Sequence, residues 1–139
     1  MATRLPEGYT PSDDDVFMNE LQLEYFRRKL LIWRDEILDD YEETREHLSS
    51  AERRDGDEVD MTGDETDLVL ELRIRGRERK LLTKIDEALE RIADGTYGYC
   101  AATGKPIGLA RLEARPTTSL CIEAQEAHER REELGNQAG

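Results

Sequence analysis

The sequence predicts a fold dominated by α-helices, in which a long antiparallel coiled-coil hairpin is followed by a small globular part and a C-terminal helix. Two long segments of helical period flank a polar stretch at residues 55–67, which carries seven carboxylates and no basic side chain. Charged residues make up 38% of the chain and hydrophobic residues 37%, a composition that suits solvated helices paired along a narrow apolar stripe. If the two segments run antiparallel, the polar stretch is the exposed tip of the hairpin and is presented to a partner.

The chain length suits one domain with an extended arm. The longest apolar run, Leu30 to Trp33, is far shorter than the roughly 20 residues of a membrane span. The N-terminus lacks the basic-then-apolar pattern of a secretion signal, so we expect a cytoplasmic protein without a membrane partner. We divide the chain into a mobile N-terminal segment at residues 1–15, the hairpin at residues 16–95 with its tip at 55–64, and a knuckle with the C-terminal helix at residues 96–139.

The net charge of -13 is unevenly distributed. Residues 35–67 hold 15 acids and 3 bases, whereas residues 68–115 hold 7 acids and 10 bases. Nucleic-acid affinity rests mainly on the neutralisation of phosphates by Lys and Arg, so a chain this acidic is a poor candidate for direct duplex binding. We expect a protein partner, or a site that contains cations.

The first arm of the hairpin is predicted to be one helix from about Val16 to Ala51, after a lead that ends near the candidate cap Ser12. Apolar or semi-apolar residues recur about every 3.5 residues, the period of a coiled coil, and neither Gly nor Pro interrupts them. We expect Phe26 and Trp33 to pack in the core. The predicted stripe consists of Leu23, Phe26, Leu30, Trp33, Ile37, Tyr41, Thr44, Leu48 and Ala51.

The second arm is predicted to restart near Gly63, with Thr62 as N-cap in a capping box with Glu65, and to stop at Asp94-Gly95. Its basic residues alternate along the chain and so spread around the helix. We expect some of them to pair with acids of the first arm at positions 39, 40, 42 and 43, and others to face outward. The predicted seam consists of Leu68, Leu72, Arg75, Arg79, Leu82, Ile85, Leu89 and Ile92.

Beyond Gly95 the helical period gives way to turn residues, which predict a small knuckle of turns or short strands. A last amphipathic helix is predicted from about Thr118 to Leu134, with Gly135 as its stop.

Two cysteines raise the question of a zinc site. The positions three residues after Cys100 and Cys121 are Thr103 and Ala124, and neither supplies the thiolate or imidazole that structural zinc requires. His128 is the nearest substitute, and three ligands make a weak site. We therefore expect two buried thiols and no bound zinc. The tip fits neither a calcium loop, which needs Gly at its sixth and Glu at its twelfth position, nor a catalytic site, since it has no His and no apolar wall.

Several independent blocks of residues occur in a recognisable order and spacing. They are Met18-Asn19-Glu20 with Gln22, Phe26-Arg27-Arg28, Leu30, Trp33-Arg34, Glu71-Leu72-Arg73, Arg77-Glu78-Arg79-Lys80-Leu81, Tyr97-Gly98-Tyr99-Cys100, Ile107-Gly108 and Arg111-Leu112-Glu113-Ala114-Arg115-Pro116-Thr117. Through them the chain resembles the DksA/TraR family of bacterial RNA polymerase regulators over roughly residues 16–135.

The resemblance implies a globular part that carries a long coiled coil into the secondary channel of RNA polymerase, with tip aspartates near the catalytic magnesium. It implies a monomeric transcription regulator of the stringent response that is not an enzyme, binds no specific DNA sequence and modulates open-complex stability together with ppGpp. The tip motif of the family falls on Asp57, Asp60 and Thr62, where Thr62 stands in place of the usual Ala, and Met61 in place of the frequent Arg.

The resemblance also implies an effector site and a zinc finger. The positions that contact ppGpp at the polymerase rim fall on Leu81, Lys84 and Arg115, with Arg77 and Arg111 in the same basic belt and Gln125 where well-known members carry Lys. Loss of that cation weakens a phosphate site. The four-cysteine finger has become Cys-x-x-Thr and Cys-x-x-Ala, which resembles the zinc-independent subgroup and implies that no cofactor is required.

Two alternatives remain open at this point. A transcript-cleavage factor also inserts an acidic-tipped coiled coil into the secondary channel. A structural coiled-coil adaptor would carry an acidic tip that is merely solvated, and it would not compete with a secondary-channel protein.

Overall fold

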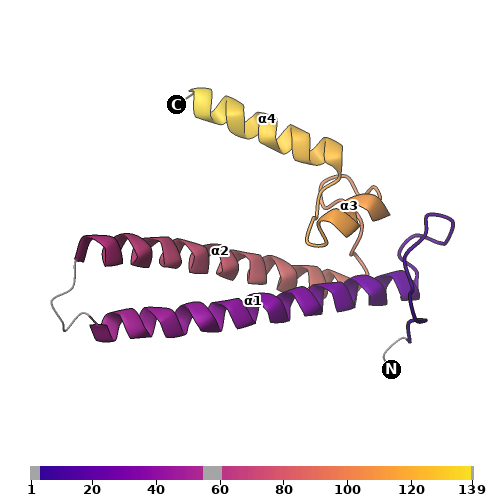
Figure 1. Cartoon of the computed structure of the whole chain (residues 1–139). Coiled ribbons are helices and arrows are strands. Elements are labelled where there is room, and N and C mark those ends of the chain that lie inside the picture. The colour runs from indigo at the N-terminus through magenta and orange to yellow at the C-terminus, as the bar shows by residue number, and fades with distance from the viewer. Residues whose placement is uncertain (1–3, 55–60, 139) are drawn as a thin grey trace. The chain divides into compact units, whose positions relative to one another are not determined.

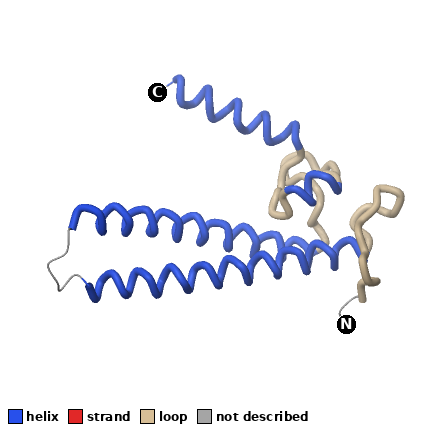
Figure 2. The backbone as a smooth tube through the Cα atoms, viewed as in Figure 1, coloured by secondary structure: helices blue, strands red, loops and turns tan. Residues whose placement is uncertain are grey.

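The computed structural model describes residues 4–54 and 61–138 of the chain. Two long helices, α1 (Glu20–Arg54) and α2 (Met61–Asp94), are followed by the short α3 (Leu109–Ala114) and by α4 (Ile122–Ala138) (Figure 1). Helices and loops make up the described part of the chain, apart from one isolated antiparallel bridge between Tyr99 and Pro106 (Figure 2). The predicted fold class is confirmed.

The chain forms two compact units that do not follow its linear order. Unit 1 combines residues 1–30 with residues 87–139, and unit 2 consists of residues 31–86. The long helices contribute to both units, since each begins in one and ends in the other. Within residues 4–54 and 61–138, no helix is long and apolar enough to cross a membrane.

Unit 2 is an antiparallel pair formed by the C-terminal part of α1 and the N-terminal part of α2 (Figure 1). On α1 the predicted stripe is confirmed at its described positions: Ile37 is buried, and Trp33 and Tyr41 are half-buried. An ion pair between Arg34 and Asp86, with Nε and Oδ1 3.0 Å apart, joins the two helices. Exposed pairs of this kind contribute little to stability, so packing along the stripe is the main support of the hairpin.

On α2 the predicted seam is wrong at two positions. Leu72 is 54% exposed and Arg79 is exposed, whereas Glu71 and Glu78 are half-buried. A coiled coil repeats in alternating steps of three and four, and a residue one position off this series lies about 100° around the helix. The apolar character of Leu72 suggested the wrong series. The half-buried or buried seam consists of Leu68, Glu71, Arg75, Glu78, Leu82, Ile85, Leu89 and Ile92.

Arg75 occupies a seam position where an apolar residue would be usual. Its guanidinium lies over the ring of Tyr41, 4.2 Å from the ring centroid, and its Nη2 donates to the Tyr41 hydroxyl at 2.6 Å. Arg79 Nη2 reaches the same hydroxyl at 3.5 Å. Hydrogen bonds from Arg79 and Arg75 lower the pKa of Tyr41. The contacts described for Arg75 on α1 are therefore with Tyr41, whereas its pairing with acids of α1 stays a prediction.

Glu78, the next seam residue, has a shifted pKa in this polar arrangement. Burial and the neighbouring charge of Asp40 raise its pKa, and the charge of Arg75 opposes the shift. Charged groups have thus replaced part of the apolar seam in the middle of the hairpin. Such a layer contributes less to stability than apolar packing, because each charge must be desolvated.

The core of unit 1 is aromatic and aliphatic. Phe26 and Leu30 of α1 are fully buried, as is Tyr97 just after α2, and the ring centroids of Phe26 and Tyr97 are 5.7 Å apart. Tyr97 donates its hydroxyl hydrogen to the carbonyl of Pro116 at 2.7 Å, which satisfies its polar end inside the core. Leu112 of α3 is also fully buried. Burial of a few large side chains therefore holds α1, the end of α2 and the knuckle together.

Glycine conformations connect α2 to the knuckle. Gly95 directly follows the end of α2 at Asp94 and has a φ of 85°, which confirms the predicted end of the helix. Gly98 has a φ of 92°, and a Cβ there would lie 2.6 Å from Cγ of Met18. The backbone at Gly98 approaches Met18 so closely that a larger residue at position 98 would displace the Met18 side chain.

Three predicted helix ends differ from the observed ones. α1 begins at Glu20 rather than near Val16, because Met18 has a φ of 57° and Asn19 caps the helix by accepting from the N–H of Gln22 at 2.9 Å. α2 begins at Met61, so Thr62 lies in its first turn instead of preceding it. α4 begins at Ile122 rather than at Thr118.

The C-terminal region differs from expectation in two further ways. α4 continues through Gly135 to Ala138, since a glycine disfavours a helix by about 1 kcal/mol without terminating it. The knuckle contains α3, a six-residue helix that the turn-rich sequence did not reveal.

The segment before α1, for which mobility remains a prediction, contacts the rest of unit 1 at several points. The carbonyl of Ser12 accepts a hydrogen bond from the buried Gln22 side chain at 3.1 Å. The rings of Tyr9 and Tyr25 lie edge to face with centroids 6.1 Å apart, and those of Phe17 and Tyr99 do the same at 5.5 Å.

Candidate functional site

The predicted tip falls largely outside the described residues. Asp57 and Asp60 lie between α1 and α2, in the part of the chain that the structure does not describe. Thr62 is placed in the first turn of α2. The two flanking helices therefore run to within a few residues of the predicted carboxylates on either side.

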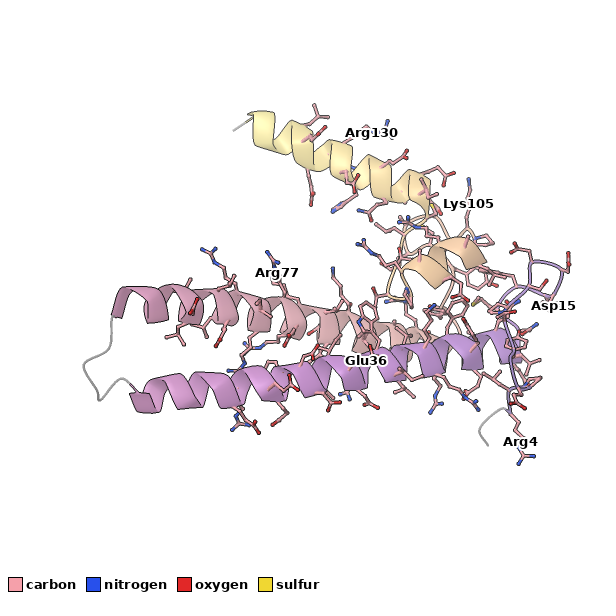
Figure 3. The ribbon with its side chains drawn as sticks, viewed as in Figure 1. Arg4, Asp15, Glu36, Arg77, Lys105 and Arg130 are labelled. Carbon is pink, nitrogen blue, oxygen red and sulfur yellow. The ribbon has the colours of Figure 1, made fainter. Side chains whose placement is uncertain are left out.

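Three of the six predicted rim residues share one face of α2. Arg77 and Lys84 are exposed, Leu81 is half-exposed, and their spacing of four and three residues places them in one row. Figure 3 shows Arg77 pointing away from α1. The row continues toward the start of α2 with Leu70 and Ile74, which are 55% and 40% exposed. We call Leu70, Ile74, Arg77, Leu81 and Lys84 the outer row.

Leu70 and Ile74 of the outer row were not among the residues predicted from the sequence. A signal was present, since Leu70 and Ile74 stand seven and three residues before Arg77. Apolar side chains beside cations on an unpaired helix face are typical of a protein-binding surface, where the apolar groups are buried and the charges orient the partner.

The other three predicted rim residues lie in unit 1. Arg115 follows α3 and is exposed, and Gln125 lies in α4, where its Nε2 donates to Glu129 at 3.1 Å. Arg111 is committed to the fold, because its Nε donates to the carbonyl of Leu120 at 2.9 Å. These three residues belong to one unit and the outer row belongs to the other, so the structure places each set by itself.

Glu113, which sequence reasoning missed, anchors the segment that bears Arg111 and Arg115. Lys29 of α1 donates both to the Glu113 carboxylate and, at 3.1 Å, to its backbone carbonyl. Burial and a hydrogen bond to Glu113 raise the pKa of Tyr25 to about 12, so this phenol stays protonated and also holds the carboxylate. The backbone beside the predicted effector residues is therefore tied to α1.

The knuckle brings three of the four predicted zinc positions together. Cys100 and Cys121 are buried, and the Thr103 hydroxyl oxygen lies 3.9 Å from Sγ of Cys121. Hydrogen bonds between backbone groups close the turn: Cys100 N–H donates to Lys105 at 2.7 Å, and Gly104 N–H donates back to Cys100 at 2.8 Å. Ala124 follows in the first turn of α4. The prediction of two buried thiols is confirmed.

The environment of Cys100 favours its thiolate. Burial raises the pKa of this thiol, but hydrogen bonds from the Thr103 side chain and from the backbone N–H groups of Cys121, Thr103 and Ala102 outweigh burial and hold the pKa at about 6. Several donors around one sulfur are also what a metal-binding turn provides.

The donor set does not fit a structural zinc ion. Thr103 offers a hydroxyl, which also accepts the N–H of Lys105 at 3.3 Å, and Ala124 offers no donor atom. Across residues 4–54 and 61–138, no group of three or more His, Cys, Asp or Glu side chains could hold a metal ion. Tetrahedral zinc needs four such ligands, or three and a water.

These features define a class of protein: a long antiparallel helical hairpin joined to a knuckle that retains half of a zinc-finger ligand set. Residues 22–92 match the family described as DnaK suppressor protein DksA, N-terminal domain. Residues 95–130 match the family described as prokaryotic dksA/traR C4-type zinc finger. The chain belongs to the DksA family, as its resemblance indicated.

Known relatives extend over most of the chain. A protein of Caulobacter vibrioides called RNA polymerase-binding transcription factor DksA is 57% identical over 126 residues, covering 91% of this chain and 89% of the relative. The Escherichia coli K12 protein of the same description is 42% identical over 126 residues, covering 91% and 83%. The structure of transcription factor DksA2 from Pseudomonas aeruginosa superposes with a TM-score of 0.79 at 49% identity, covering 84% of this chain and 90% of that one.

Proposed function

We propose that this protein is a transcription regulator that binds RNA polymerase and acts through the tip of its helical hairpin, without catalytic activity of its own. The observation that carries the proposal is the match to RNA polymerase-binding transcription factors along 91% of the chain, at 57% and 42% identity. A bacterial RNA polymerase as partner implies work in the cytoplasm.

The hairpin suits entry into a narrow channel of the polymerase. Its two helices pair in unit 2, and the acidic stretch lies at their junction in the sequence. The outer row supplies apolar contacts and cations for the channel wall. In this proposal Asp57 and Asp60 reach toward the catalytic magnesium, so the active part of the assembly belongs to the polymerase.

Two measurements test this function. The protein should compete with another secondary-channel protein for RNA polymerase, and it should change the lifetime of open complexes at a ribosomal RNA promoter. Absence of competition would favour a structural adaptor instead. Cleavage of the transcript in stalled complexes would favour a cleavage factor.

We further propose that ppGpp binds where the knuckle meets the polymerase and enhances the effect modestly. Arg115 and Lys84 are exposed and can contact phosphates, whereas Gln125 supplies an amide in place of a cation. A charge-assisted hydrogen bond contributes about 1.5–3 kcal/mol, so its loss weakens binding by roughly tenfold or more. The fixed segment around Glu113 supports this site, because it orders the backbone that bears Arg115.

Substitution at two positions tests the ppGpp site. Gln125→Lys is expected to increase the enhancement by ppGpp, and Arg115→Ala is expected to abolish it without preventing polymerase binding. Open-complex lifetimes at fixed salt, with and without ppGpp, measure both effects, since surface charges are screened. An unchanged ppGpp response in both variants would place the site elsewhere.

We also propose that the fold requires no zinc. The purified protein is expected to contain far less than one zinc per chain and to keep its melting temperature in a chelator, because Thr103 and Ala124 supply no zinc ligand and backbone hydrogen bonds close the turn. Elemental analysis and thermal unfolding with and without chelator measure this. Stoichiometric zinc together with unfolding on chelation would refute the proposal.

A further inference from the structure

Two sulfur atoms that lie 21 positions apart in the sequence converge in the knuckle. Cys100 and Cys121 are only 3% and 4% exposed. The Thr103 hydroxyl lies 3.9 Å from Cys121 Sγ, and the turn that contains Thr103 begins at Cys100, whose carbonyl accepts the N–H of Gly104 at 2.8 Å. The Ala101 N–H donates to the Ser119 carbonyl at 2.8 Å, which holds this turn beside the segment that leads to Cys121. Both buried thiols therefore lie where the same two segments meet. The proposed transcriptional function makes no use of them.

The number and type of these donors select a class of metal ion. Two thiolates cannot complete the tetrahedral shell of zinc, and oxygen-seeking ions such as magnesium or calcium do not favour sulfur. Soft thiolate ligands select Cu(I), and a monovalent d¹⁰ ion is satisfied by two thiolates in a linear arrangement. The missing third and fourth ligands, which exclude zinc, are no obstacle to such an ion.

We propose that Cys100 and Cys121 form a two-thiolate site for a soft monovalent metal ion, Cu(I). Each thiol loses its proton as its sulfur binds the ion, so two protons leave and a bis-thiolate complex of charge -1 remains. No electron is transferred. The hydrogen-bond donors around the Cys100 sulfur stabilise that charge in the role usual for groups around a metal site.

The surroundings also allow an ion to enter. Residues 101–106 follow Cys100 directly and are all exposed, so they form a thin surface layer beside this buried thiol. Burial of the sulfurs shields a bound Cu(I) from water and from a second protein molecule. The expected stoichiometry is therefore one ion per chain.

A competition titration tests the proposal. The reduced full-length protein, kept without oxygen, is mixed with the coloured complex of Cu(I) and bathocuproine disulfonate, and the loss of colour measures transfer. We expect transfer of one Cu(I) per chain. Cys100→Ser and Cys121→Ser should each weaken it by at least about tenfold. His128→Gln, which removes an exposed imidazole of α4, is the matched control and should leave it unchanged.

Two further measurements keep the test decisive. Circular dichroism checks that the serine variants fold, and X-ray absorption at the copper edge of the unmodified protein should show two sulfur neighbours and no nitrogen. Excess Zn²⁺ should not displace the copper. Any of four results would overturn the proposal: no transfer, transfer that persists in both serine variants, nitrogen or oxygen ligands at the copper, or displacement by zinc.

Discussion

Asp60→Asn is expected to remove most of the effect on open-complex lifetime while RNA polymerase affinity changes no more than a few-fold. The amide keeps the shape of the side chain and removes its charge, so contacts that hold the hairpin in place should persist while the proposed electrostatic action near the polymerase magnesium is lost. Affinity is measured by competition with another secondary-channel protein, and activity by open-complex lifetime on a ribosomal RNA promoter.

Asp55→Asn is the matched control for this prediction. It removes the same charge from the same acidic stretch, at a position outside the tip motif of the family. Its effect on open complexes should be small. Equal losses of binding and activity in Asp60→Asn, or equal effects of the two substitutions, would contradict a specific role for Asp60.

Phe26→Ala is expected to lower the free energy of unfolding by about 3–5 kcal/mol, because it leaves a cavity in the core of unit 1. Phe26 is 0% exposed and packs on Tyr97 and Tyr25. Since domains are stable by only about 5–15 kcal/mol, this loss is a large share of the total. Urea unfolding followed by circular dichroism and by the fluorescence of Trp33 measures it.

The control for this substitution is Ile32→Ala in the same helix. Ile32 is 62% exposed, so its truncation opens no cavity and should change the unfolding free energy by no more than about 0.5 kcal/mol. Similar losses in the two variants would show that α1, rather than the core around Phe26, limits stability.

The hairpin was predictable because its signals are local and repeated. The stripe from Phe26 to Tyr41 needed only the period of the apolar residues, and the end of α2 needed only Gly95. The seam of α2 was harder to predict, since Glu71 and Glu78 take positions at which an apolar residue is expected. Their placement depends on what α1 presents to them, which no pattern within α2 reveals.

The site was predictable in parts. The two buried thiols followed from the ligand count. The assignment of Arg77, Lys84 and Arg115 to a phosphate site came from the family resemblance and stays a prediction, and the structure shows that all three are exposed. The ion pair between Lys29 and Glu113 was not predictable, because it joins residues that are 84 positions apart in the sequence. Lys and Glu side chains usually lie at the surface of proteins, so their presence alone predicts no contact. The short α3 was hidden by the turn residues around it.

The pairing of Arg75 with Tyr41 has a consequence for the length of the hairpin. In a coiled coil with a uniformly apolar seam, one helix can slide past the other by a heptad, about 10 Å, at little cost. Here such a slide would bring Arg75 opposite either Arg34, a like charge, or Leu48, which has neither ring nor hydroxyl. The Arg75–Tyr41 contact therefore disfavours either shift of the two arms. By favouring this alignment, the contact between Arg75 and Tyr41 also favours one length of the hairpin. A constant length suits a protein whose proposed action depends on how far its tip extends into the partner.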